Sequence, residues 1–196
     1  MIKIGITGGI GAGKSFVCKR LSAMGFPIFD CDKEGKLIMN SHPIVRFRLT
    51  ELLGQECYQN DTLNRAFVAE KIFNNPTLKQ QVEAIVHPMV AEQFVTWASA
   101  QDSPFVFVES AILYESGFDQ QVDKVVVVDA NKETRIARIL QRDACSKSQA
   151  EERINAQMSS EEKQKKADYV IVNNHGSDIN SQLFDLVKKL YKLITV

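Results

Sequence analysis

The sequence predicts an α/β fold whose core is a mostly parallel, five-stranded sheet. Three of five short, β-rich runs are almost unbroken in valine, isoleucine or phenylalanine, as expected when helices cover both faces of a sheet. Stretches with helical periodicity separate the runs, which is the order of elements in α/β proteins. The five predicted strands are Lys3–Thr7, Pro27–Asp30, Phe105–Glu109, Val125–Asp129 and Tyr169–Val172.

The first strand leads directly into a glycine-rich loop. Residues 8–15 read Gly-Gly-Ile-Gly-Ala-Gly-Lys-Ser, the G-x-x-x-x-G-K-S pattern of a phosphate-binding loop, or P-loop. A helix that begins at about Lys14 would turn its positive end and the loop N–H groups toward one hollow. Lys14 would meet the β- and γ-phosphates, Ser15 would hold Mg²⁺, and the N–H of Phe16 should reach the α-phosphate. The alternative is a glycine-rich turn before an ordinary helix.

We therefore expect the three-layer fold of P-loop NTPases. Each predicted strand also ends at or just before a polar residue, and ligands of open α/β sheets bind beyond the carboxyl ends of the strands. These residues are Thr7, Asp30, Glu109, Asp129 and Asn173.

Two helical blocks interrupt this core. Residues 33–100 have helical periodicity, with helices expected at Pro43–Leu53, Ala66–Phe73 and Leu78–Trp97, and they contain no convincing strand. Roughly 70 residues are too many for an ordinary connection, so this block is an insertion placed to cover a second substrate. Residues 138–166 are expected to form a mobile helical lid over the phosphates. The rest of the single domain is then about 1–32, 101–137 and 167–196.

The composition excludes several classes of protein. A chain of 196 residues that is 44% hydrophobic can bury a full core without disulfides or a structural metal. Lys+Arg and Asp+Glu are 24 each, so nothing suggests a nucleic-acid or membrane surface. The four cysteines have no metal-ligand spacing, and no apolar run could span a bilayer or serve as a signal peptide. We expect a cytoplasmic protein with reduced cysteines, either a monomer or a small homo-oligomer.

Among P-loop proteins, a small phosphotransferase fits best. A GTPase would carry a guanine-reading N-K-x-D segment, but Thr134 follows Asn131-Lys132-Glu133 where the aspartate belongs. A motor-type ATPase usually needs a larger body and an Asp-Glu pair after the third strand, where this chain has Glu109-Ser110. A kinase for a small hydroxyl acceptor remains, and it also needs a base and cations for the transferring group.

Two pairs of side chains are candidates for those tasks. Asp30 and Asp32 would point the same way if extended, so one could accept a proton while the other orients the hydroxyl or holds a metal-bound water. Alternatively, Asp32 caps the following helix. Arg138 and Arg142 lie four residues apart on one helix face, with Arg153 and Lys163 further along; solvated surface cations are the alternative.

The chain resembles the dephospho-CoA kinase family over residues 2–176, in order and at compatible spacing. The resemblance rests on the extended P-loop Ile6–Ser15, on Phe29-Asp30-Cys31-Asp32, on His87-Pro88, on Glu109–Glu115, on Gln141-Arg142-Asp143 with Arg153-Ile154 and Gln157, and on Ala167–Asn174. Ala111, Glu109 and Phe16 differ from the residues usual in that family, but none of these differences removes a required chemical group.

The resemblance implies ATP-dependent phosphorylation of the ribose 3′-hydroxyl of dephospho-CoA, the last step of coenzyme A synthesis. It implies that Asp32 is the catalytic base, and that Arg138 and Arg142 neutralise charge in the transferring group. His87, with Asp32 and Glu109, would contact the acceptor, although a capping or core role for His87 is an equal alternative. ATP, with Mg²⁺, would be held by Gly9, Gly11, Ala12, Gly13, Lys14, Ser15, Phe16 and Asn173.

Two rival functions remain at this stage. One is a P-loop kinase for another small hydroxyl acceptor, such as a nucleoside or shikimate, which shares the loop but not the His87-Pro88 or Ala167–Asn174 segments. The other is a non-catalytic nucleotide-binding regulator, which would have no need to keep Asp32.

Overall fold

The computed structural model describes residues 1–73 and 75–195, which form two compact units. One unit comprises Met1–Phe29 with Gln101–Val196, and the other comprises Asp30–Ala100. The insertion expected from the sequence spans residues 33–100. None of the helices in the described part of the chain has both the length and the apolar character needed to cross a membrane.

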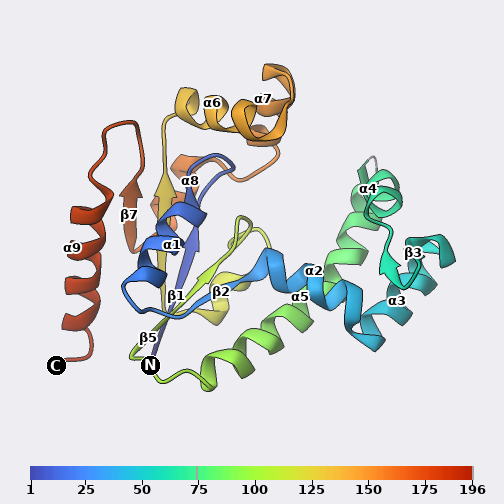
Figure 1. The fold of residues 1–196 in the computed structure, drawn as a ribbon, viewed down its shortest axis with the longest axis horizontal. Helices are drawn as coiled ribbons and strands as arrows, with labels where there is room; N and C mark the ends of the chain where they lie inside the picture. The colour runs from blue at the N-terminus through green and yellow to red at the C-terminus, as the bar shows by residue number, and fades with distance from the viewer. Residues whose placement is uncertain (74, 196) are drawn as a thin grey trace. The chain divides into compact units, whose positions relative to one another are not determined.

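The first unit is built on a five-stranded sheet with the order β2-β5-β1-β6-β7 (Figure 1). Strand β1 pairs in parallel with β5 and with β6, and β6 pairs in parallel with β7. Each strand starts within one residue of its predicted start, so the predicted α/β class with a parallel sheet is confirmed. The strands are β1 Ile2–Thr7, β2 Ile28–Asp30, β5 Phe105–Glu109, β6 Lys124–Asp129 and β7 Tyr169–Val172.

Helices α1, Lys14–Ala23, and α9, Ile179–Lys192, cover one face of this sheet. Their apolar stripes meet alternate residues of the strands, because side chains two apart along a strand share a face. The resulting cluster is almost completely buried and includes Ile4, Ile6, Val17, Leu21, Phe105, Phe107, Val126, Val128, Ile171, Leu183 and Leu190.

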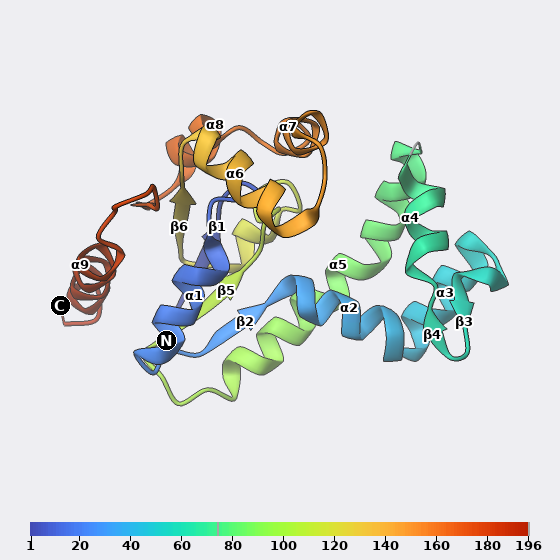
Figure 2. The same ribbon diagram turned by 45° about the horizontal axis from the view of Figure 1, so that its top comes forward.

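Three helices lie between β6 and β7 in the sequence. They are α6 Lys132–Asp143, α7 Lys147–Asn155 and α8 Ser160–Lys166. Helices α6 and α7 lie beyond the carboxyl ends of β1 and β6 (Figure 2). The short α7 and α8 each begin with a capping box, from Ser146 with Gln149 and from Ser159 with Glu162, which satisfies N–H groups that so short a helix cannot pair internally. Ala150 in α7 packs in a small apolar cluster with α6.

The second unit is mainly helical. Its elements are α2 Cys31–Ser41, α3 Pro43–Leu53, η1 Gln55–Cys57, β3 Tyr58–Gln59, β4 Thr62–Leu63, α4 Arg65–Phe73 and α5 Pro76–Ser99. Helix α5 continues through Pro88, and its buried stripe of Val82, Val86, Val90, Phe94 and Ala98 recurs every four residues. The predicted helices of this block are therefore confirmed, with boundaries shifted by at most two residues.

The prediction that this block contains no strand is wrong. Strands β3 and β4 pair antiparallel across Asn60 and Asp61, which both have positive φ, 49° and 61°. Asparagine and aspartate tolerate this conformation better than other residues, and two such residues make the turn of a tight hairpin. Strands of two residues are too short to show an alternation of apolar and polar residues. Only the turn residues Asn60 and Asp61 therefore indicate this hairpin in the sequence. Arg46 holds the turn by donating to the carbonyl oxygen of Asp61 at 2.7 Å.

Candidate active site

The loop between β1 and α1 requires glycine at positions where it contacts other backbone or side-chain atoms. A Cβ on Gly8 would lie 2.0 Å from the carbonyl oxygen of Val128. Gly13 has a φ of 96°, and a Cβ there would lie 2.1 Å from Nδ2 of Asn173. Both contacts are shorter than any side chain tolerates, so two of the pattern glycines are fixed by close approach to β6 and to the residue after β7.

Three successive carbonyl groups of this loop point outward to donors on other elements. The Ile10 carbonyl accepts from Nε of Arg135 at 2.9 Å, and the Gly11 and Ala12 carbonyls both accept from Nη1 of Arg138 at 3.2 Å. Nδ2 of Asn173 also donates to the Ala12 carbonyl, at 2.8 Å.

The N–H groups of the loop therefore face the other way. In a planar trans peptide the N–H points opposite to the C=O, so the N–H groups of Gly11 and Gly13 are aimed away from Arg135 and Arg138. The N–H of Ala12 closes a turn onto the Gly9 carbonyl at 3.1 Å. With α1 beginning at Lys14, the loop presents backbone N–H groups and a positive helix end to one hollow, which is an arrangement that binds phosphate.

Lys14, predicted to bind phosphate, and Ser15, predicted to bind the metal, lie at the start of α1. Nζ of Lys14 donates to the Gly8 carbonyl at 3.0 Å, across the base of the loop. The hydroxyl of Ser15 donates to Oε1 of Glu109, at the end of β5, at 2.8 Å. The N–H of Phe16 donates to the Gly13 carbonyl at 3.1 Å within the first helical turn. The pairing of Ser15 with Glu109 brings together two oxygen ligands of the kind that Mg²⁺ prefers.

The two predicted arginines behave differently in this unit. Arg138 is partly buried, and besides its two loop carbonyls it donates through Nη2 to the Asn173 carbonyl at 2.9 Å. Arg142 is exposed and makes a two-pronged pair with Asp143, at 2.6 and 2.8 Å, which Arg153 joins at 2.8 Å. Arg138 therefore braces the P-loop from outside, whereas the guanidinium of Arg142 is bound by Asp143.

The expected geometry of the aspartates after β2 is wrong. The chain turns helical at Cys31, so Asp30 and Asp32 do not lie two apart on an extended strand. The N-cap is Asp30, whose carboxylate accepts from the N–H of Lys33 at 2.9 Å. Asp32 lies in the first turn of α2 with an exposed side chain. An aspartate before a helical stretch gains more from capping unpaired N–H groups than from remaining extended.

His87 lies in the middle of α5, one residue before Pro88, and is half-buried. Burial lowers its pKa below the usual value of 6.5, while Glu83 partly offsets this and Lys79 adds to it. Burial therefore favours the neutral imidazole, which can donate or accept a hydrogen bond. Asp32 and His87 both belong to the second unit, and their predicted roles toward the acceptor remain predictions.

Comparison with known proteins gives the family. A family model described as dephospho-CoA kinase matches residues 2–178. A dephospho-CoA kinase of Bacteroides fragilis is 42% identical over 194 residues, which are 98% of this chain and 95% of that protein. This chain belongs to the dephospho-CoA kinase family. Among solved structures, TT1252 from Thermus thermophilus matches with a TM-score of 0.86 and 31% identity over 96% of both chains. Dephospho-CoA kinase from Campylobacter jejuni matches at 0.66 and 27%, over 98% of this chain and 95% of that one.

Sequence reasoning missed two side chains that contact this loop, Arg135 and Gln157. Arg135 is only 6% exposed, although arginine is rarely buried. Its position in the sequence, next to the apolar stripe of α6 formed by Ile136 and Ile139, could have predicted this burial. The role of Gln157, quoted only as part of a motif, was also missed: its Oε1 accepts from the N–H of Ile10 at 2.7 Å.

The predicted lid is also more firmly attached than expected. Lys163, taken as a lid cation, is completely buried and donates to the carbonyl of Ala111 at 2.8 Å and to Oε2 of Glu115 at 3.2 Å; its ammonium lies 2.9 Å from Oε1 of the same carboxylate. Glu115 also accepts from the N–H of Met158 at 3.1 Å. Lys163 therefore fixes α8 to the loop after β5, and it is not available for the transferring phosphoryl group while this pair is intact.

Proposed function

We propose that this chain transfers the γ-phosphoryl group of ATP to the ribose 3′-hydroxyl of dephospho-CoA, giving CoA and ADP. Family membership over nearly the whole chain supports the acceptor. The observation that supports ATP as the phosphoryl donor is the geometry of the P-loop. Three of its carbonyls point outward to Arg135, Arg138 and Asn173, and its opposite face is left for phosphate.

The nucleotide is held by the P-loop amides and by the start of α1. The N–H groups of Gly9, Gly11, Gly13, Lys14 and Ser15 form the candidate set along the loop and first turn. Those of Ala12 and Phe16 also donate to the Gly9 and Gly13 carbonyls, so they would share these bonds with phosphate. Lys14 carries the cation for the β- and γ-phosphates, and it exchanges its contact with the Gly8 carbonyl for phosphate oxygens. Asn173 donates to the Ala12 carbonyl of the loop, and we propose that it contacts the adenosine part of ATP.

The residues beside Lys14 fit Mg²⁺. Ser15 would offer its hydroxyl as a direct ligand in place of its hydrogen bond to Glu109, and Glu109 would accept hydrogen bonds from water around the metal. In the described part of the chain, no cluster of three or more histidine, cysteine, aspartate or glutamate side chains is arranged to hold a metal. This agrees with a metal held mainly by the nucleotide and a single hydroxyl. When bound, Mg²⁺ neutralises charge on the β- and γ-phosphate oxygens.

Phosphoryl transfer then needs a base and a cation. Asp32 accepts the proton of the 3′-hydroxyl as that oxygen bonds to the γ-phosphorus, and the bond to the bridging oxygen breaks to release ADP. Arg138 adds positive charge behind the loop, and Arg142 can add more if it leaves Asp143. The second unit, with His87 on α5, is proposed to bind the acceptor.

The test is coupled ADP release with dephospho-CoA, adenosine, shikimate and no acceptor at equal concentrations. Only dephospho-CoA is expected to give rapid turnover. Lys14→Ala is expected to weaken ATP binding and slow the reaction together, whereas Lys19→Ala, an exposed lysine on the same helix, should change neither. Equal rates with shikimate or adenosine would contradict the proposed acceptor.

A further inference from the structure

Arg135 is a buried cation on the outer side of the P-loop. Its guanidinium donates through Nε to the Ile10 carbonyl at 2.9 Å and through Nη1 to the hydroxyl of Ser160, at the start of α8, at 3.0 Å. A Cβ on Gly9 would lie 2.1 Å from Nη2, so the guanidinium rests directly against the loop backbone. The side chain is 6% exposed.

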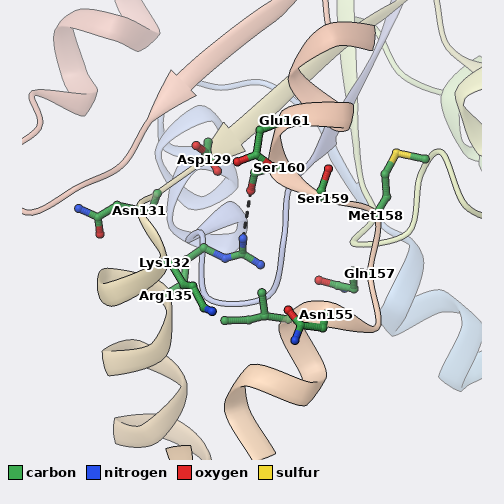
Figure 3. Close-up of a pocket in the computed structure, with 12 residues that line it drawn as sticks. Asp129, Asn131, Lys132, Arg135, Asn155, Gln157, Met158, Ser159, Ser160 and Glu161 are labelled. Carbon is green, nitrogen blue, oxygen red and sulfur yellow. Dashed lines mark hydrogen bonds between the residues drawn. The ribbon is translucent and has the colours of Figure 1, made fainter. Parts of the chain in front are cut away.

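The charge of Arg135 has only neutral hydrogen-bonding partners. Among the ion pairs of the described residues, whose N···O distances are 4.0 Å or less, none includes Arg135, although Asp129 and Glu161 are near enough to act on it at longer range. Figure 3 shows the guanidinium projecting into a cavity of about 360 Å³, toward Ser160 and between Asp129 and Gln157. A buried charge without an adjacent counter-ion is costly, and an anion on the far side of a thin loop offsets that cost.

Gln157 binds the N–H of Ile10, the loop residue whose carbonyl accepts from Arg135. Its Oε1 accepts from the Ile10 N–H at 2.7 Å, so the N–H and the C=O of Ile10 are both bound by side chains that line this cavity. With both groups fixed, the tip of the loop cannot rotate, and the next N–H, that of Gly11, keeps its orientation toward the hollow. This fixation lowers the conformational cost of binding a polyphosphate.

We propose that Arg135 and Gln157 are positioning residues for the polyphosphate of ATP: together they fix the two peptide groups that flank Ile10, and the charge of Arg135, which only the more distant Asp129 and Glu161 offset, attracts phosphate through the loop. The proposal rests on the proposed function only in taking ATP as the ligand. It does not depend on which acceptor is phosphorylated.

The first test uses Arg135→Met, which keeps most of the volume and removes the charge and the donors. Calorimetry with ATP and Mg²⁺, without any acceptor, is expected to give a Kd about 10-fold or more above wild type, the scale for hydrogen bonds to a charged group. The KM for dephospho-CoA should stay within about twofold, because the hydrogen bonds of Arg135 to Ile10 and Ser160 lie within the first unit and share no partner with the residues proposed to bind the acceptor. Arg135→Lys keeps the charge and should recover part of the affinity, more at low salt than at high salt. The matched control, Lys188→Gln on α9, removes an exposed charge and should bind ATP as wild type does.

A second variant covers the case in which Arg135→Met does not fold. Gln157→Glu keeps an oxygen acceptor for the Ile10 N–H but places a negative charge in the cavity beside Arg135. It should preserve the melting temperature and still weaken ATP binding by about 10-fold. If Gln157→Glu, or a folded Arg135→Met, binds ATP within about twofold of wild type, the proposal is overturned and these residues only pack the loop. If the wild-type protein binds ATP but does not phosphorylate dephospho-CoA, the proposed function is overturned, whereas the roles proposed for Arg135 and Gln157 in ATP binding are not.

Discussion

The buried pair of Lys163 and Glu115 gives a sharp prediction about stability. Lys163→Met removes an ammonium that is 1% exposed and that contacts Glu115 at 2.9 Å and the Ala111 carbonyl at 2.8 Å. Breaking a buried pair by deleting one partner costs about 3–5 kcal/mol. Glu115 is 26% exposed and keeps its bond from the Met158 N–H, so water recovers part of that cost and about 2–3 kcal/mol remains.

Urea and thermal unfolding measure this loss. For a chain of this length, about 2–3 kcal/mol corresponds to a melting temperature lower by roughly 5–10 °C. The double variant Lys163→Met with Glu115→Gln should recover about 1–2 kcal/mol, because no unpaired charge is left behind. Lys165→Met, an exposed lysine on the same helix, is the control and should stay within about 0.5 kcal/mol of wild type. If Lys163→Met is as mild as that control, α8 is not anchored by this pair and the reasoning is refuted.

Three further predictions concern the nucleotide, the base and a histidine. Gly13→Ala puts a Cβ 2.1 Å from Asn173 Nδ2 at a φ of 96°, so ATP affinity should fall about 10-fold or more in a binding titration, and unchanged affinity would show that the loop tolerates the change. Asp32→Asn should keep ATP binding and lower kcat by about 10² or more, as measured by steady-state rates; a rate near that of wild type would exclude Asp32 as the base. The folded-state pKa of His87 lies below 6.5, so the unfolded chain binds the extra proton first and stability should decrease as the pH falls below 6.5. His87→Gln should flatten that part of the stability profile, and an equally steep profile in the variant would contradict the assignment.

The sheet and its P-loop could be predicted because their signals are local. Nearly continuous apolar runs give buried parallel strands such as β5 and β6, and the glycine pattern follows β1 directly. The β3–β4 hairpin could not be predicted in the same way, since strands of two residues show no alternation. The error at Asp30 and Asp32 has a different cause: both can cap a helix, and which of them does so depends on where the chain leaves β2.

The contacts around the loop depend on tertiary structure. Arg135 and Arg138 share one helix and look alike in sequence, yet one is buried against Gly9 and Ile10 while the other spans the Gly11 and Ala12 carbonyls. Lys163 looks like a surface cation because its partners lie far from it in sequence, 48 residues away in the case of Glu115. Burial of a charge is decided by such distant partners, and a sequence pattern does not record them.

Direct localisation of the transferred phosphoryl group tests the account most closely. The protein is incubated with Mg²⁺, dephospho-CoA and ATP labelled at the γ-phosphorus, and the product is separated and treated with a nucleotidase specific for 3′-phosphates. We predict that the label moves to a product with the mass of CoA and is released by that nucleotidase. Label found only in free phosphate, or in a product resistant to the nucleotidase, would contradict transfer from the P-loop to the ribose 3′-hydroxyl.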